Sequence, residues 1–337
     1  MTEAPISSEP SPPDLNGEGI QIPARAAGRR RSSARLKRLL VWCCLAAFFL
    51  GVGSGYWLGK RPSQADAGQG SEIQKRARLL LEQINPAQGY TLPVVYGDIG
   101  PQLLAAGAID LGKFVGVYKQ SGKPLSEEQL GILTRGSDAP ITINTGNANF
   151  LLNFFWAFGL TNQNPILSEG PLMARGGKER IGEFASTGGW TIGVKTATEL
   201  YASLAIVPLN PAQQARLTEV AREVYRPCCD NPTHMPDCNH GMAMLGLLEL
   251  MASQNATVEE MFTAAKYINA YWFPQQTLEI ATMIQVTQKS NFDQADARQV
   301  VGARFSSGSG YQAVHQWLAE KDLLEQIPGS GGSCAVQ

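Results

Sequence analysis

Apolar residues recur at helical spacing along most of the chain after residue 72. Residues 72–84 place their apolar side chains on one face, and Asn85-Pro86 ends the pattern. Residues 148–159 are apolar nearly all round. The first pattern predicts an amphipathic helix, and the second predicts a helix at the centre of the core.

Start signals mark three further helices. Ser126 precedes two glutamates, Asn210 precedes a proline, and Thr257 stands three residues before Glu260. Ser, Asn and Thr are good N-cap residues, proline suits the first helical position, and Thr-x-x-Glu is a capping box. The helices expected from all these signals cover residues 72–84, 99–107, 110–119, a segment from 126, 148–159, 196–206, 211–225, 240–253, 257–271, 274–289, 293–303 and 310–326.

Strand patterns are few and short. Residues 91–96 and 141–144 are the two candidates, and a glycine-rich stretch that includes residues 186–190 is expected to form a long loop before residue 196. A loop of that length inside a folded domain is either functional or a sign that elements within it were not recognised. The predicted fold class is therefore mainly α: a globular multi-helix domain with long loops.

One segment near the N-terminus predicts a membrane span. Residues 39–59 carry no charge, and a helix of about twenty residues crosses a bilayer core. Seven basic residues precede the span and two follow it, which predicts a cytoplasmic N-terminus and a main domain outside. A cleaved signal peptide and a soluble core helix are the alternatives.

These patterns divide the chain into five parts and give its expected place in the cell. We expect a single-pass protein of the cytoplasmic (plasma) membrane, with the lipid bilayer as one partner and other proteins of a membrane complex as candidates for further ones. The expected parts are a disordered cytoplasmic tail (1–37), a transmembrane signal-anchor (38–59), a linker (60–71), an extracytoplasmic helical domain (72–328) and a flexible tail (329–337).

The charge distribution does not favour nucleic acid as a partner. The net charge is −1, and residues from 63 onward carry 19 basic and 25 acidic side chains. The basic run at 25–38 is local and adjoins the apolar segment, so it fits the orientation of a membrane anchor better than a nucleic-acid surface.

Cysteine and histidine gather in one short segment. The chain has six cysteines and three histidines, and five of these nine residues fall between positions 228 and 240. Thiolates and imidazoles bind soft and borderline metal ions. The segment is expected to be a loop that ends at a helix N-terminus near Cys238. The predicted metal ligands are Cys228, Cys229, His234, Cys238 and His240, with Met244 as an additional candidate.

The spacing of these residues leaves the chemistry open. It lacks the Cys-x2-Cys pairs of common zinc modules, whereas Cys238, His240 and Met244 supply the ligand types of copper electron-transfer sites. Zinc or copper is therefore expected, and an iron–sulfur cluster less so. One alternative is a disulfide between Cys238 and Cys228 or Cys229, which would staple an assembly module of a membrane complex.

A second alternative is an extracytoplasmic thiol oxidoreductase that uses the adjacent pair Cys228–Cys229. No nucleophile elbow, zinc-protease motif, phosphate-binding loop or dinucleotide fingerprint is present in the sequence. The sequence therefore leaves open whether the protein is an enzyme.

Overall fold

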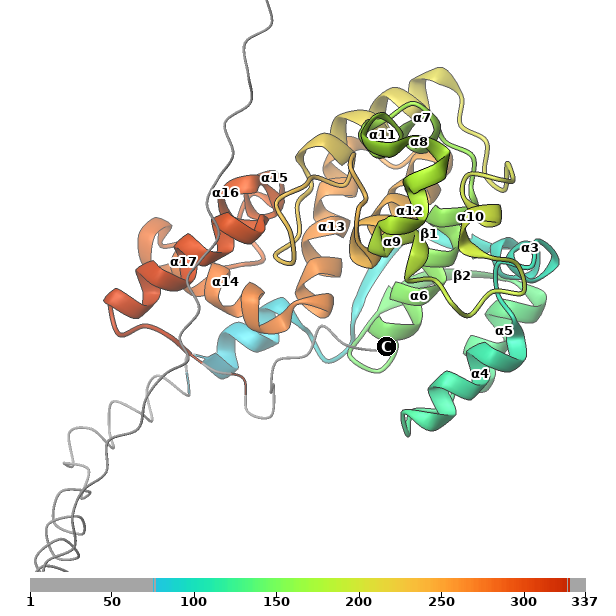
Figure 1. The fold of residues 1–337 in the computed structure, drawn as a ribbon. Helices are drawn as coiled ribbons and strands as arrows, with labels where there is room; N and C mark the ends of the chain where they lie inside the picture. Colours follow the sequence, from blue (N-terminus) through green and yellow to red (C-terminus); the bar gives the residue numbers. More distant parts are fainter. Residues whose placement is uncertain (1–74, 76, 326, 328–337) are drawn as a thin grey trace, which may run out of the picture. The chain divides into compact units, whose positions relative to one another are not determined.

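The computed structural model of the chain describes residues 75, 77–325 and 327 (Figure 1). The predicted N-terminal tail, membrane span, linker and C-terminal tail all lie outside these residues. Among the residues described, none of the helices has the length and apolar character needed to cross a bilayer.

The described chain is mainly helical and contains one two-stranded sheet. A first helix ends at residue 84. The elements that follow it are β1 (Tyr90–Gly97), α3 (Ile99–Ala105), α4 (Leu111–Gln120), α5 (Glu127–Arg135), β2 (Ser137–Ile143), α6 (Ala148–Thr161), α7 (Pro165–Ser168), α8 (Pro171–Arg180), the 3-10 helix η1 (Ile181–Glu183), α9 (Ala185–Gly188), α10 (Ala197–Leu200), α11 (Pro211–Glu223), α12 (Asn239–Ser253), α13 (Val258–Trp272), α14 (Pro274–Gln288), α15 (Ala297–Val301), α16 (Ala303–Ser306) and α17 (Gly308–Glu320).

Helices α6 and α12 cross at the centre of the larger hydrophobic core (Figure 1). Their backbones meet at two glycines. A Cβ atom on Gly159 would lie 2.2 Å from the carbonyl oxygen of Met242, and one on Gly246 would lie 2.5 Å from that of Phe155. Nearly every side chain of α6 is buried, so the predicted central role of residues 148–159 is confirmed.

Strands β1 and β2 pair antiparallel, with Tyr90 opposite Ile143 and an irregular register further along. The other edge of β1 is partly closed by a side chain. The amide of Gln254 accepts a hydrogen bond from Val95 N–H at 3.0 Å and donates one to the Val95 carbonyl at 2.9 Å. A glutamine amide thus replaces one residue of a neighbouring strand at this edge.

The start signals in the sequence correspond to real helix caps. The side chains of Ser126, Asn210 and Thr257 each accept a hydrogen bond from the backbone N–H three residues later. In each case the side chain at that third position also accepts from the N-cap backbone, which completes a capping box. The predicted starts of α5, α11 and α13 are therefore confirmed.

The prediction was wrong for residues 196–206, where the helical segment α10 is only one turn long. Ala202 has a positive φ of 48°, and its N–H donates to the carbonyl of Leu160. The chain here lies alongside the end of α6, where Leu204 forms a β-bridge with Asn162. These tertiary contacts outweigh the local helical pattern.

The expected long loop before residue 196 contains short helices. Prolines occupy the first positions of α7 and α8, where a missing backbone N–H costs nothing. Farther along the chain, the predicted helix 293–303 begins only at α15, because Asp296 caps that helix. The predicted helix 310–326 begins earlier, after the cap residue Ser307, and ends at Glu320.

Candidate metal centre

The cysteines belong to a loop, residues 224–238, that joins α11 to α12. The backbone N–H and the hydroxyl of Thr233 both donate to the carbonyl of Val224, at 2.8 and 3.0 Å. The N–H of His234 donates to the carbonyl of Ala221. These bonds fold the loop back onto the end of α11 and fix where its side chains lie.

The same loop is bonded to the C-terminal helices. The N–H of Gly308 donates to the carbonyl of Cys229 at 2.9 Å, and the N–H of Ser309 donates to the Asp230 carboxylate at 2.7 Å. The N–H of Tyr225 donates to the carbonyl of Val301 at 2.8 Å. The loop that connects α11 to α12 therefore lies against α15 and the start of α17.

Three thiols meet at one point of this loop. The sulfur of Cys238 lies 3.6 Å from that of Cys228 and 3.9 Å from that of Cys229, and the sulfurs of Cys228 and Cys229 are 4.0 Å apart. A disulfide bond measures about 2.05 Å, so all three thiols are free. The disulfide that the sequence offered as an alternative is not formed in this structure.

The spacing of the three sulfurs matches a single metal ion. Sulfurs bound tetrahedrally to zinc at about 2.3 Å lie about 3.8 Å from one another. The observed separations of 3.6–4.0 Å bracket that value. The triangle can therefore accept an ion with little movement of the loop.

A buried arginine lies behind the thiols. Arg226 is 1% exposed, and its Nε donates to the Cys238 sulfur at 3.0 Å. Its other nitrogens donate to the Asn231 carbonyl at 2.8 Å and to the Asp237 carboxylate at 2.7 Å. A Cβ on Gly241 would lie 2.4 Å from the guanidinium, so glycine at that position leaves room for it.

Cys238 is the most strongly polarised of the three thiols. It is the N-cap residue of α12, and the N–H of Gly241 donates to its sulfur at 3.3 Å. Hydrogen bonds from Cys228 and Cys229, together with the charge of Arg226, hold the pKa of Cys238 well below its usual range. The hydrogen bonds that Cys228 gives to its two neighbours raise its own pKa. A thiolate is thus favoured at the helix N-terminus, as expected for this position.

The predicted histidine ligands are not in this group. Only Cys228, Cys229 and Cys238 form a set of three or more Cys, His, Asp or Glu ligand atoms within 4.8 Å of one another in the described chain. The ring of His240 packs on Phe273, with the ring centres 4.5 Å apart, although it still contributes to the lowered pKa of Cys238. Burial and the charge of Arg222 lower the pKa of His234.

The additional candidate Met244 and the remaining histidine are engaged elsewhere. Met244 is 1% exposed and belongs to the larger hydrophobic core. His315, the histidine outside the cluster, has its Nδ1 2.9 Å from the buried carboxylate of Glu279. Neither side chain is a member of the thiol group.

Sequence reasoning did not identify Arg226. The available signal was an arginine two residues before the cysteine pair, in a segment where a buried thiolate would need a positive neighbour. Asp237, the residue before Cys238, accepts from Arg226 and from the Asn231 amide, the latter at 2.6 Å.

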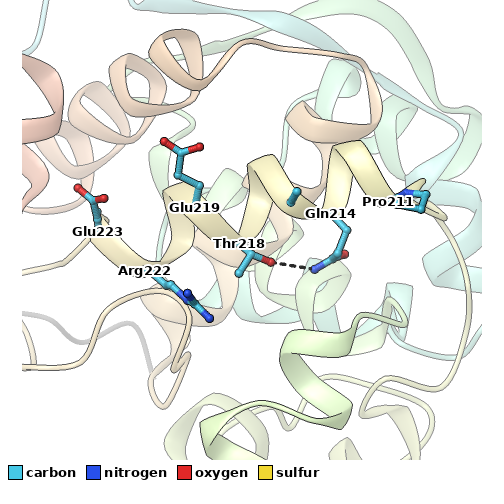
Figure 2. A pocket seen from close by; sticks show the side chains of 7 residues that line it. Pro211, Gln214, Thr218, Glu219, Arg222 and Glu223 are labelled. Carbon is cyan, nitrogen blue, oxygen red and sulfur yellow. Dashed lines mark hydrogen bonds between the residues drawn. The ribbon is translucent and has the colours of Figure 1, made fainter.

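The surface of α11, the helix before this loop, carries a shallow depression. Figure 2 shows the side chains that line it, which point outward from that one helix. The amide of Gln214 donates to the hydroxyl of Thr218 at 3.4 Å, and the carboxylates of Glu219 and Glu223 pair with Arg298. Several of the polar groups that line the depression are thus paired with one another or with side chains outside it, and the lining carries no cluster of metal ligands.

Comparison of the chain with protein-family models, with curated proteins and with solved structures found no significant match.

Proposed function

We propose that the protein binds a metal ion through the thiolates of Cys228, Cys229 and Cys238, with zinc as the preferred ion and copper as the alternative. The observation that carries this proposal is the triangle of free sulfurs, 3.6–4.0 Å apart, around one point of a hydrogen-bonded loop. Three convergent thiolates are a strong donor set for borderline and soft ions.

The charges near the site favour a divalent ion. Three thiolates and one divalent ion carry a net charge of −1, which the buried guanidinium of Arg226 offsets. With a monovalent copper ion the three thiolates would leave a net charge of −2, of which Arg226 can offset only one. The remaining negative charge would lie near the carboxylate of Asp237, which already pairs with Arg226. Uncompensated charge at a partly buried site is costly, so zinc is the better fit.

The alternative functions remain outcomes of the test. A structural staple needs two cysteines, whereas three meet here, and the third thiol is what favours a metal site over a staple. A thiol oxidoreductase would also use a polarised Cys238. The proposal also includes the location of the metal site, on a membrane-anchored domain outside the cell. That location is expected from the sequence pattern of residues 38–59.

The test is metal analysis and mass measurement of the full chain, purified in detergent under reducing and, separately, under non-reducing conditions. We expect one metal ion per chain, lost in Cys238→Ser and retained in the control His234→Ala, because His234 is not a member of the thiol group. A metal-free protein whose mass is two hydrogens short would favour the staple. A metal-free protein with a reactive thiol would favour the oxidoreductase.

A further inference from the structure

We infer that the tris-thiolate centre keeps its fourth coordination position open and takes there a neutral donor from outside the protein, water at rest and an imidazole-type nitrogen as a ligand. This inference rests on the proposed function. It goes beyond it by stating what the bound ion would do: exchange one ligand while the protein retains the other three.

The described chain offers no fourth His, Cys, Asp or Glu ligand atom close to all three sulfurs. The carboxylate of Asp237 comes close to one of them, with one oxygen 3.7 Å from the Cys229 sulfur. That oxygen accepts from Arg226 at 2.7 Å, and the other accepts from Asn231 at 2.6 Å. Recruiting Asp237 to the metal would leave the buried guanidinium without its carboxylate partner, which is strongly unfavourable.

His240 hydrogen-bonds to Cys238 alone among the three thiols and packs against two aromatic rings. Its ring is 6% exposed and lies against Phe273 at 4.5 Å and Trp272 at 5.8 Å between ring centres. No ring nitrogen of His240 belongs to the set of ligand atoms that converge on one point. His240 therefore acts beside Cys238 and is not expected to bind the metal.

The triangle of sulfurs has one buried side and one exposed side. Arg226 lies on the buried side, where it is 1% exposed, whereas Cys228 is exposed to solvent. An ion placed among the three sulfurs is thus reached from the side of Cys228. Zinc sites with three protein ligands and an accessible fourth position are those that exchange ligands, whereas purely structural sites are closed by four.

Charge selects the class of the incoming ligand. The ion, three thiolates and Arg226 together are neutral. A second anion would add a negative charge next to Asp237, whose carboxylate is already 2.7 Å from that guanidinium. A neutral nitrogen or oxygen donor adds no charge. Exchange then consists of one neutral ligand leaving with its lone pair and another binding, with no change of oxidation state.

The test uses the full chain loaded with cobalt(II), which reports its coordination through its visible spectrum, and imidazole as the probe. We expect strong sulfur-to-cobalt charge-transfer bands from three thiolates. We expect imidazole to shift the cobalt ligand-field bands saturably while the charge-transfer bands persist. Absence of cobalt binding would contradict the proposed function itself. Cobalt binding with no response to imidazole would overturn only the open position.

Two variants identify a fourth protein ligand if one exists. His240→Phe preserves the aromatic packing, and Cys334→Ser removes the cysteine nearest the C-terminus, which lies outside the described residues. We expect both variants to keep the wild-type spectrum and the same imidazole response. An unresponsive wild type whose response appears in either variant would show that the position is closed by that residue and would overturn the inference.

Discussion

The Nε of Arg226 donates a hydrogen bond to the sulfur of Cys238 across 3.0 Å, and the guanidinium that makes this contact is almost wholly buried. A charged donor stabilises a thiolate more than a neutral one does. The same guanidinium binds Asp237, so the loop places one cation between a carboxylate and a sulfur cluster. Several expectations for the loop and for its surroundings depend on such contacts.

Replacing Arg226 with methionine should weaken metal binding. The variant keeps much of the side-chain volume and removes both the charge and the bond to Cys238. Loss of a partner that orients a metal ligand typically lowers metal affinity about 10–100-fold. Competition with a chromophoric chelator measures this change. The matched control is Arg298→Met, which removes a half-exposed arginine paired with Glu219 and Glu223. Unchanged affinity in a folded Arg226→Met protein would refute the role assigned to Arg226.

The metal-free protein should form a disulfide between Cys238 and one of its two neighbours under mild oxidation. The sulfur separations of 3.6 and 3.9 Å require only small side-chain rotations to reach bonding distance. Peptide mapping by mass spectrometry identifies the pair. Zinc should slow the reaction strongly, because its thiolate ligands are occupied. Equal oxidation rates with and without zinc would mean that the sulfurs that form the disulfide are not the sulfurs that bind zinc.

Glu249 should make the protein less stable as the pH rises. Burial within α12 raises the pKa of Glu249 well above its usual 4.5, although the Asn162 amide donates to it at 3.0 Å. Above the usual value the unfolded chain releases this proton while the folded chain retains it, so the free energy of unfolding decreases with pH. Glu249→Gln imitates the protonated carboxyl and removes that decrease.

Urea unfolding of the metal-free protein, compared at about pH 4 and about pH 8, measures this difference. Glu249→Gln should gain stability relative to the wild type at the higher pH and show a smaller difference at the lower one. A difference that does not vary with pH would mean that Glu249 does not titrate abnormally in the folded protein.

Gly246→Ala should destabilise the crossing of α6 and α12. The added methyl group would lie 2.5 Å from the carbonyl oxygen of Phe155 and 2.8 Å from the nitrogen of Gly159, both backbone atoms. Overpacking of this kind costs about 1–3 kcal/mol, as measured by urea unfolding. The control is Gly116→Ala in α4, where a Cβ meets nothing within 4 Å. The control should gain roughly 0.5–1 kcal/mol from helix propensity.

Local sequence signals were enough to predict most of the helices. Asn210, Ser126 and Thr257 act through atoms within three residues of themselves, so their caps can be read directly from the sequence. The one-turn helix α10 could not be predicted in this way. The end of this helix is fixed by the hydrogen bond from the N–H of Ala202 to the carbonyl of Leu160, two residues that are far apart in the sequence.

The candidate site, too, could be predicted from local signals only in part. The sequence located the loop and placed Cys238 at the start of a helix, where the structure has it as the N-cap. It did not separate the three cysteines from the two histidines. For His240 that separation involves Trp272, the last residue of α13, and Phe273, which follows it, because both rings pack on His240. Contacts between residues this far apart in the sequence leave no local sequence pattern from which they could be predicted.

The bonds from Gly308 and Ser309 to the cysteine loop give α17 an unexpected role. The first turn of this helix is tethered to the carbonyl of Cys229 and the carboxylate of Asp230, so its order depends on the order of the loop. Whatever immobilises the three sulfurs also slows the opening of that turn. Amide hydrogen exchange at the start of α17 therefore serves as a remote reporter of occupancy at the centre.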